Sequence, residues 1–100
     1  MARFDVHQMP GRGVGYVLDV QADLLSELAT RVVVPLLPED AAPKPLSDLN
    51  PAFEIDGMRH VMVTQAIASI PRRELTRQVC SLAADRDSIT RALDVLLTGF

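Results

Sequence analysis

The sequence predicts a mainly β protein with one C-terminal helix. Apolar and polar side chains alternate in short runs over the first four-fifths of the chain, an Asp-Gly pair separates two of these runs, and the apolar period lengthens from two to nearly four near the end. Five short, mostly antiparallel strands followed by one helix favour a small antiparallel barrel that the helix closes or plugs. Residues 1–100 are expected to form a single domain, because a chain of this length builds one core.

Two strands are expected within the first twenty residues. Phe4 and Val6 alternate with polar neighbours, and the run MPGRG at residues 9–13 breaks that strand. The following strand, residues 14–20, is apolar on much of both faces. It is therefore expected to be central in the sheet.

Three consecutive valines, residues 32–34, predict a third strand within residues 30–37, because β-branched side chains pack well on a pleated sheet. Pro35 cannot donate a hydrogen bond to a neighbouring strand, so it belongs at an edge, a bulge or a strand end. Three prolines within residues 38–45 predict an extended surface loop.

The Asp56-Gly57 pair predicts a tight hairpin between strands at residues 52–55 and 58–63, because both residues tolerate the positive φ that a two-residue turn requires. The second of these strands is expected to run on to about Ser69, where Ile70-Pro71 ends it. Residues 72–79 are compatible with a short helical turn or with an irregular strand.

The helix is predicted over residues 82–97, where apolar side chains recur with a helical period. Ser81 or Asp85 is positioned to cap its start, and Gly99 lies where a left-handed residue commonly ends a helix. Phe100 is a large apolar side chain that is costly to leave in water, so it is expected either to pack into a dimer or to anchor a partner. A dimer is the first expectation, because a core this small is marginal alone.

The charge and the single cysteine exclude several classes of protein. A formal net charge of -3 argues against direct binding of nucleic acid, which needs a basic field. Cys80 is the only cysteine, so no intrachain disulfide or cysteine-based zinc site can form. Its small side chain is expected to be buried, and a reducing cytoplasmic location is expected for the protein. Residues 1–6 lack the apolar run of a signal peptide, and no run approaches the roughly 18 apolar residues of a membrane span.

Catalytic and metal-binding patterns are weak. His7 and His60 lack the spacing of paired metal ligands, so they are expected to be ordinary surface or half-buried residues, and no metal or other cofactor is expected. Asp19 and Asp23 are expected to cap a turn. The glycines of residues 11–15 precede a strand instead of opening a helix, which excludes a phosphate-binding loop.

One enzymatic alternative stays open. Small barrels can cleave RNA with an arginine and a nearby acid-base group, and four residues of suitable type could in principle converge: Arg31, Arg59, His60 and Thr64. The spacing of these four residues in the sequence does not require that they converge.

Four segments in order make the chain resemble the CcdB family, whose members poison bacterial DNA gyrase and are neutralised by an antitoxin encoded beside them. The segments are LDVQADLL at residues 18–25, RVVVPL at 31–36, ASIP at 68–71, and DSITRAL at 87–93 leading to Gly99. The resemblance implies an SH3-like barrel of the CcdB/MazF-like toxin fold, a homodimer with its C-terminal helices near the two-fold axis, and a role in plasmid maintenance. It implies no enzymatic activity, because such a toxin inhibits its topoisomerase by binding it.

The resemblance also assigns partner surfaces. The A subunit of gyrase is expected to bind the helix end and an apolar pair, namely Leu24, Leu25, Asp94, Leu97, Thr98, Gly99 and Phe100. The antitoxin's disordered tail is expected to meet the basic group Arg72, Arg73 and Arg77, although these arginines also suit a solvated face balanced by Glu74, Asp85 and Asp87. The family ends in tryptophan, glycine and an aliphatic residue, whereas Thr98 stands at the tryptophan position here. A non-toxic or retargeted relative is therefore an alternative.

Overall fold

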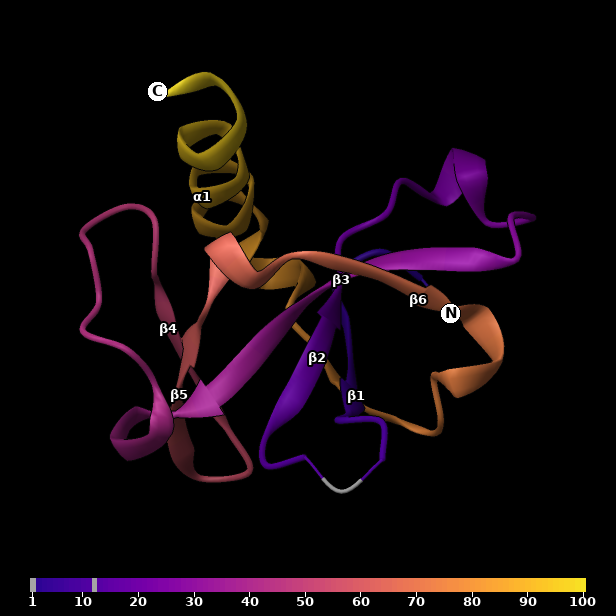
Figure 1. The fold of residues 1–100 in the computed structure, drawn as a ribbon, viewed down its shortest axis with the longest axis horizontal. Coiled ribbons are helices and arrows are strands. Elements are labelled where there is room, and N and C mark those ends of the chain that lie inside the picture. Colours follow the sequence, from indigo (N-terminus) through magenta and orange to yellow (C-terminus); the bar gives the residue numbers. More distant parts are fainter. Residues whose placement is uncertain (1, 12) are drawn as a thin grey trace.

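The computed structural model describes residues 2–11 and 13–100. Met1 and Arg12 lie outside the described residues, and Arg12 belongs to the predicted break at residues 9–13. This part of the chain forms seven strands and one α-helix, and Figure 1 shows how they are arranged. They are β1 Asp5–Gln8, β2 Tyr16–Asp19, β3 Thr30–Pro38, β4 Ala52–Ile55, β5 Met58–Met62, β6 Ala68–Pro71, β7 Gln78–Ser81 and α1 Arg86–Thr98. The prediction of a mainly β fold with one C-terminal helix is confirmed. The predicted number of five strands is wrong, because β6 and β7 were not foreseen as separate strands.

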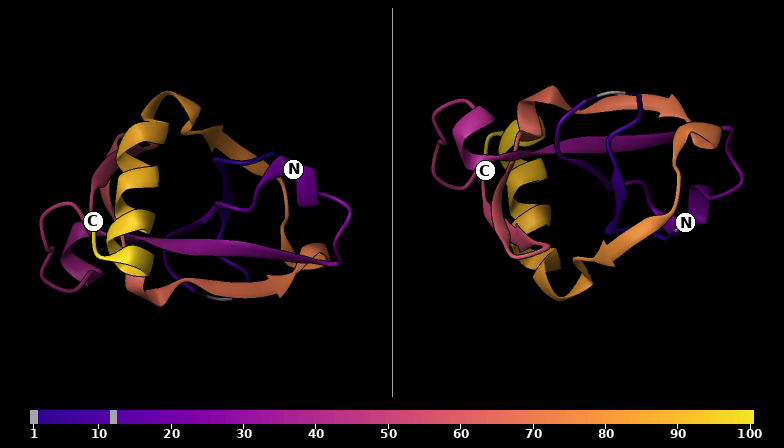
Figure 2. Two further views of the ribbon diagram at one scale, coloured as in Figure 1. Left: turned by 90° about the horizontal axis from the view of Figure 1, so that it is seen from above. Right: turned by 90° about the horizontal axis from the view of Figure 1, so that it is seen from below.

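The strands form one curled antiparallel sheet in the order β4-β5-β3-β2-β1-β7, and β6 also pairs with β3. The predicted central position of the second strand is confirmed, since β2 lies between β1 and β3. Because β4 and β7 stand at the two ends of this order, the sheet is a half-barrel and not a ring closed by strand pairing. Figure 2 shows its curvature from two sides.

Strand β3 changes partner in its middle, and Pro35 lies at that point. The first half of β3 pairs with β6 as far as Val33, and its last residues pair with β5 from Leu36 onward. The Pro35 carbonyl oxygen accepts a hydrogen bond from the Val63 amide on this same side. Since the donor and acceptor of one strand residue point the same way, the missing N–H of Pro35 faces the gap between β5 and β6 and costs no ladder hydrogen bond.

The Asp56-Gly57 hairpin is confirmed, with φ values of 54° and 80° at the two turn residues. The prediction of one strand from Met58 to Ser69 is wrong. Residues 63–67 stand opposite only Val34 and Pro35, so the extra length forms a 3-10 helix, Thr64–Ala66, between β5 and β6. The ambiguous stretch 72–79 is half helical and half extended: a 3-10 helix, Arg72–Glu74, leads into β7.

The core lies between the sheet and α1, which packs beside β4 and β5 (Figures 1 and 2). Helix α1 contributes Ile89, Ala92 and Leu93 to the core. It begins at Arg86, later than predicted, because a 3-10 helix over Ala83–Asp85 comes first. The Ser81 Oγ accepts a hydrogen bond from the Ala83 amide in that 3-10 helix. The prediction that Ser81 or Asp85 caps the start of the α-helix is wrong, because α1 follows Asp85 without a side-chain cap. Within the described ranges, no helix is long and apolar enough to cross a membrane.

Candidate functional site

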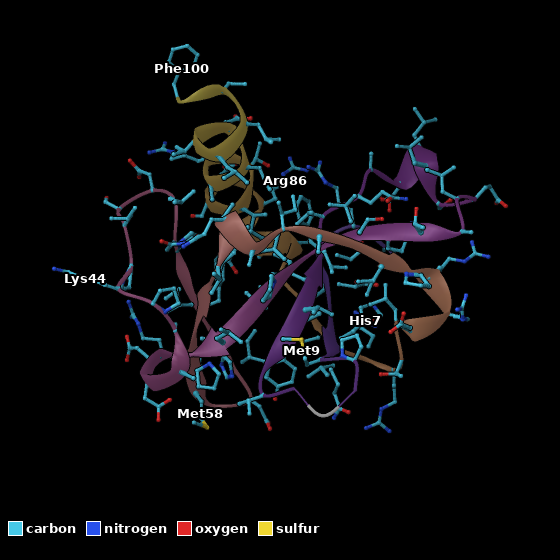
Figure 3. All side chains as sticks on the ribbon, viewed as in Figure 1. His7, Met9, Lys44, Met58, Arg86 and Phe100 are labelled. Atoms are coloured by element: carbon cyan, nitrogen blue, oxygen red, sulfur yellow. The ribbon has the colours of Figure 1, made fainter. Side chains whose placement is uncertain are left out.

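The end of α1 presents apolar side chains to solvent. Gly99 ends the helix in a left-handed conformation, as predicted, and its amide donates to the Asp94 and Val95 carbonyls. The Thr98 hydroxyl donates to the Asp94 carbonyl at 2.7 Å, so its side chain is turned back onto the helix. Leu97 is 71% exposed although it lies on the predicted apolar side, and Phe100 is 89% exposed. Figure 3 shows Phe100 projecting from the tip of the molecule.

A second apolar element rises on the same side of the molecule, between β2 and β3 (Figure 1). We call residues 22–29 the leucine loop. It contains a 3-10 helix, Asp23–Leu25, and exposes three leucines: Leu24 is 92% exposed, and Leu25 and Leu28 are about half exposed. The loop is therefore an apolar element held out into water.

A groove of about 510 Å³ runs between the leucine loop and α1. Its apolar lining comes from the loop, from β3, from the link before β6 and from the helix, through Leu25, Leu28, Val32, Ile67, Leu93 and Leu97. Arg3 and Asp94 add charges at the groove, and both also line a neighbouring hollow of about 490 Å³ that reaches Phe100. The leucine loop, the groove and the helix tip thus form one continuous surface.

The structure brings together three of the residues assigned to target binding, because Leu25, Asp94 and Leu97 all line the groove. Leu24, Thr98, Gly99 and Phe100 lie outside its lining, on the two elements that flank it. Sequence reasoning missed Arg3, Leu28, Val32 and Ile67. The signal for Leu28 was a third leucine in a connection between strands, whereas the other three depend on tertiary packing.

The arginines assigned to antitoxin binding lie elsewhere, on the connection between β6 and β7. We call Arg72, Arg73 and Arg77 the arginine patch, and all three are exposed. Within residues 2–11 and 13–100, ion pairs form at other positions and none involves the patch. The expected balance by neighbouring carboxylates is thus not realised as direct pairs. The Arg72 guanidinium instead donates to the Ser26 carbonyl of the leucine loop at 2.9 Å.

A buried ion pair, which sequence reasoning did not foresee, joins β2 to β3. Both side chains are fully buried, with Arg31 Nη2 at 2.6 Å and Nε at 2.9 Å from Asp19 Oδ2. Asp19 Oδ1 also accepts a hydrogen bond from the Gln21 amide, which is the predicted turn-capping role. Burial raises the pKa of Asp19, and the hydrogen bond from Arg31 opposes that rise. Asp23 caps no turn in this way; its Oδ1 accepts from the Arg3 amide.

The four residues considered for RNA cleavage do not converge. Arg31 pairs with Ile70 at one end of β3, and His60 pairs with Pro38 at the other, a separation of about 23 Å along the strand. Arg59 binds Glu39 on the surface, and the Thr64 hydroxyl donates to the Leu49 carbonyl inside the protein. Each of these residues therefore has a structural partner of its own.

Both histidines and the cysteine depart from expectation. His7 and His60 are 2% and 4% exposed, so the prediction of surface or half-buried histidines is wrong. The Nδ1 of His7 contacts the Thr76 carbonyl, from the connection that covers it, and His60 packs edge-on against Tyr16. Cys80 is half-buried, and burial together with Asp5 raises the pKa of its thiol. Over the described ranges, no cluster of three potential metal ligands occurs.

The sequence matches a known protein family, and the fold is similar to several solved structures. A family model described as "CcdB protein" matches residues 3–99. A search of curated sequences found no match. Among solved structures, an endoribonuclease in complex with its cognate antitoxin from Mycobacterial species has a TM-score of 0.77 at 19% identity and covers 97% of this chain and 94% of that one. An endoribonuclease from Mycobacterial species has a TM-score of 0.78 at 17% identity and covers 97% of this chain and 90% of that one.

A third structure, the Mycobacterium tuberculosis toxin MazF-mt6, gives a TM-score of 0.74 at 17% identity and covers 90% of this chain and 92% of that one. At such low identities these three likenesses concern the fold. The family model spans nearly the whole sequence, including both elements that border the groove. The chain belongs to the CcdB family.

Proposed function

We propose that this protein is the toxin of a type II toxin-antitoxin pair and that it acts in the cytoplasm by binding the A subunit of DNA gyrase through the end of α1. The observation that carries the proposal is the exposed apolar surface of the helix tip and the leucine loop. Soluble proteins rarely hold several large apolar side chains together in water unless a partner covers them. Leu24, Leu97 and Phe100 are the most exposed of these side chains and are the natural anchors.

Binding fits the structure better than catalysis does. Arg31 is neutralised by Asp19 inside the protein, and Arg59, His60 and Thr64 lie at separate places with separate partners. A general base and a charged stabiliser must lie within reach of the same substrate atom to act together. Binding through the apolar surface does not require catalytic groups to meet at one substrate atom.

A homodimer and an antitoxin complete the proposed assembly. Two copies with their α1 ends side by side would cover part of the groove, where Leu25 and Leu28 are half exposed in the single chain, and leave the tips for the target. The arginine patch carries positive charge without carboxylate partners in the described chain, which suits an acidic segment of the antitoxin. A toxin of this fold with its cognate antitoxin is among the similar solved structures.

Induced expression without antitoxin is expected to arrest growth and to trap cleaved DNA on gyrase. Leu97→Ser and Phe100→Ser are each expected to weaken binding to the gyrase A subunit by about thirty-fold, the loss typical of an interface anchor. Binding is measured by calorimetry with purified protein. Met58→Ser is the matched control, because Met58 is 60% exposed and lies at the opposite end of the molecule (Figure 3).

Equal weakening by Met58→Ser would place the binding surface elsewhere. Healthy growth and no trapped DNA, with a folded protein in the cells, would count against gyrase poisoning and favour the non-toxic or retargeted relative. The Thr98 hydroxyl, turned onto the helix where the family carries tryptophan, is the feature that favours this alternative.

RNA cleavage is the second candidate function, favoured by the endoribonucleases among the similar folds. The expected result is that purified protein leaves a defined RNA intact, because the candidate residues do not share a site. Gel electrophoresis after incubation checks this. Cleavage that Arg59→Ala or His60→Ala abolishes would establish the ribonuclease instead.

A further inference from the structure

The leucine loop is held in place by hydrogen bonds from outside it. Four donors reach it from three other parts of the chain, and each contact is short. The contacts are Arg3 N to Asp23 Oδ1 at 2.8 Å, Gln21 Nε2 to the Leu25 carbonyl at 2.9 Å, Arg72 Nη1 to the Ser26 carbonyl at 2.9 Å, and Arg72 N to the Ala29 carbonyl at 2.8 Å. An exposed apolar loop that is fixed in this way is preorganised for a partner, which lowers the entropy lost on binding.

Arg72 differs from the other donors because a partner can reach it. Gln21 is buried, and the contacts from Arg3 N and Arg72 N are made by the main chain. The contact between the Arg72 guanidinium and the Ser26 carbonyl is exposed, and it joins residues 46 apart in the sequence. It therefore links the arginine patch directly to the leucine loop.

We propose that Arg72 is a positioning residue that couples these two surfaces. An acidic segment of the antitoxin that pairs with the arginine patch draws the Arg72 guanidinium away from Ser26, and the leucine loop then loosens. The exchange is favourable because a carboxylate accepts from a guanidinium in two charge-assisted hydrogen bonds, whereas Ser26 offers one neutral carbonyl. Leu24 and Leu25 are then no longer held for the target. This inference rests on the proposed function and concerns its regulation.

Amide hydrogen exchange of the purified full chain tests the coupling. The Leu25, Ser26 and Leu28 amides donate within the loop, to the Ala22, Asp23 and Leu25 carbonyls, so their exchange reports on the loop. Arg72→Ala is expected to speed these three exchanges by about five-fold, the effect of losing one hydrogen bond.

Arg73→Ala is the matched control. It removes the same charge from the neighbouring residue, and loop exchange is expected to stay at the wild-type rate. Arg72→Lys keeps the positive charge and a side chain that can donate to the Ser26 carbonyl, and it is expected to restore most of the protection. No change in Arg72→Ala, or the same change in Arg73→Ala, would overturn the positioning role.

A titration of the unmodified protein with a hexaglutamate peptide tests the acidic partner without any substitution. Saturation is expected to speed exchange of the same three amides, and the Arg72→Ala variant is expected to show no further change. Absence of binding, or binding that leaves the loop amides unaltered, contradicts the proposal. Gyrase is absent from this experiment, so a protein that does not poison gyrase fails the growth assay and still passes this one.

Discussion

Replacement of Gly15 by alanine is expected to lower the free energy of unfolding by about 4 kcal/mol, the sum of a strained backbone and an overpacked contact. Gly15 has a φ of 95°, and an added Cβ would collide with the Leu36 carbonyl oxygen of β3. That oxygen belongs to the main chain of a central strand, so it cannot move aside cheaply. The total free energy of unfolding of a small domain is about 5–15 kcal/mol, so this loss is a large share of the protein's stability. Urea denaturation measures the change.

Gly11→Ala separates the collision from the backbone conformation. Gly11 also has a positive φ, 74°, but an added Cβ would meet no atom within 4 Å. The expected loss is therefore only about 1 kcal/mol, the usual penalty for a side chain at such a position. If the two variants lose equal stability, close approach to β3 is not the reason for glycine at position 15.

The second large effect is expected at the buried ion pair. Arg31→Met leaves the Asp19 carboxylate without its partner inside the protein, and breaking such a pair costs about 3–5 kcal/mol. The double variant with Asp19→Leu in addition removes both charges, and its loss is expected to be much smaller. Urea denaturation of the two variants at neutral pH gives the comparison. A double variant as unstable as the single one would show that packing, and not the lone charge, causes the loss.

The decrease in the free energy of unfolding caused by Arg31→Met is expected to depend on pH. Burial already raises the pKa of Asp19 above its ordinary value, and removal of Arg31 raises it further. A carboxyl group with a raised pKa in the folded state favours folding below its unfolded pKa, and that contribution disappears as the pH rises through the folded pKa. The variant is therefore expected to lose most stability at neutral pH and less as the pH falls toward about 4. A loss that does not change with pH would contradict the charge argument.

Local chemistry predicted part of the fold well. The Asp56-Gly57 hairpin and the glycine that ends α1 depend on residues that adopt positive φ, and both are found where expected. The break between β5 and β6 was missed because it depends on how many residues stand opposite Pro35, a property of the pairing with β3. Sequence alternation alone cannot distinguish one long strand from two strands with three extra residues between them.

Long-range contacts also limited prediction of the site. Leu25, Asp94 and Leu97 were assigned to one surface from the resemblance, and they do line one groove. Ile67 joins that groove only because the 3-10 helix after β5 brings it beside β3. The burial of Arg31 against Asp19 likewise depends on neighbouring strands, so a residue that suited catalysis by type turned out to be part of the interior.

The pairing of β1 with β7 has a consequence for the timing of synthesis. Asp5 and Gln78, which are hydrogen-bonded, are 73 residues apart. A ribosome adds about 5–20 residues per second, so β1 waits about 4–15 s for the strand that completes its side of the sheet. Leu93 and Leu97 are made later still, and the groove needs both. The groove of a nascent chain is therefore incomplete until Leu97 has been translated.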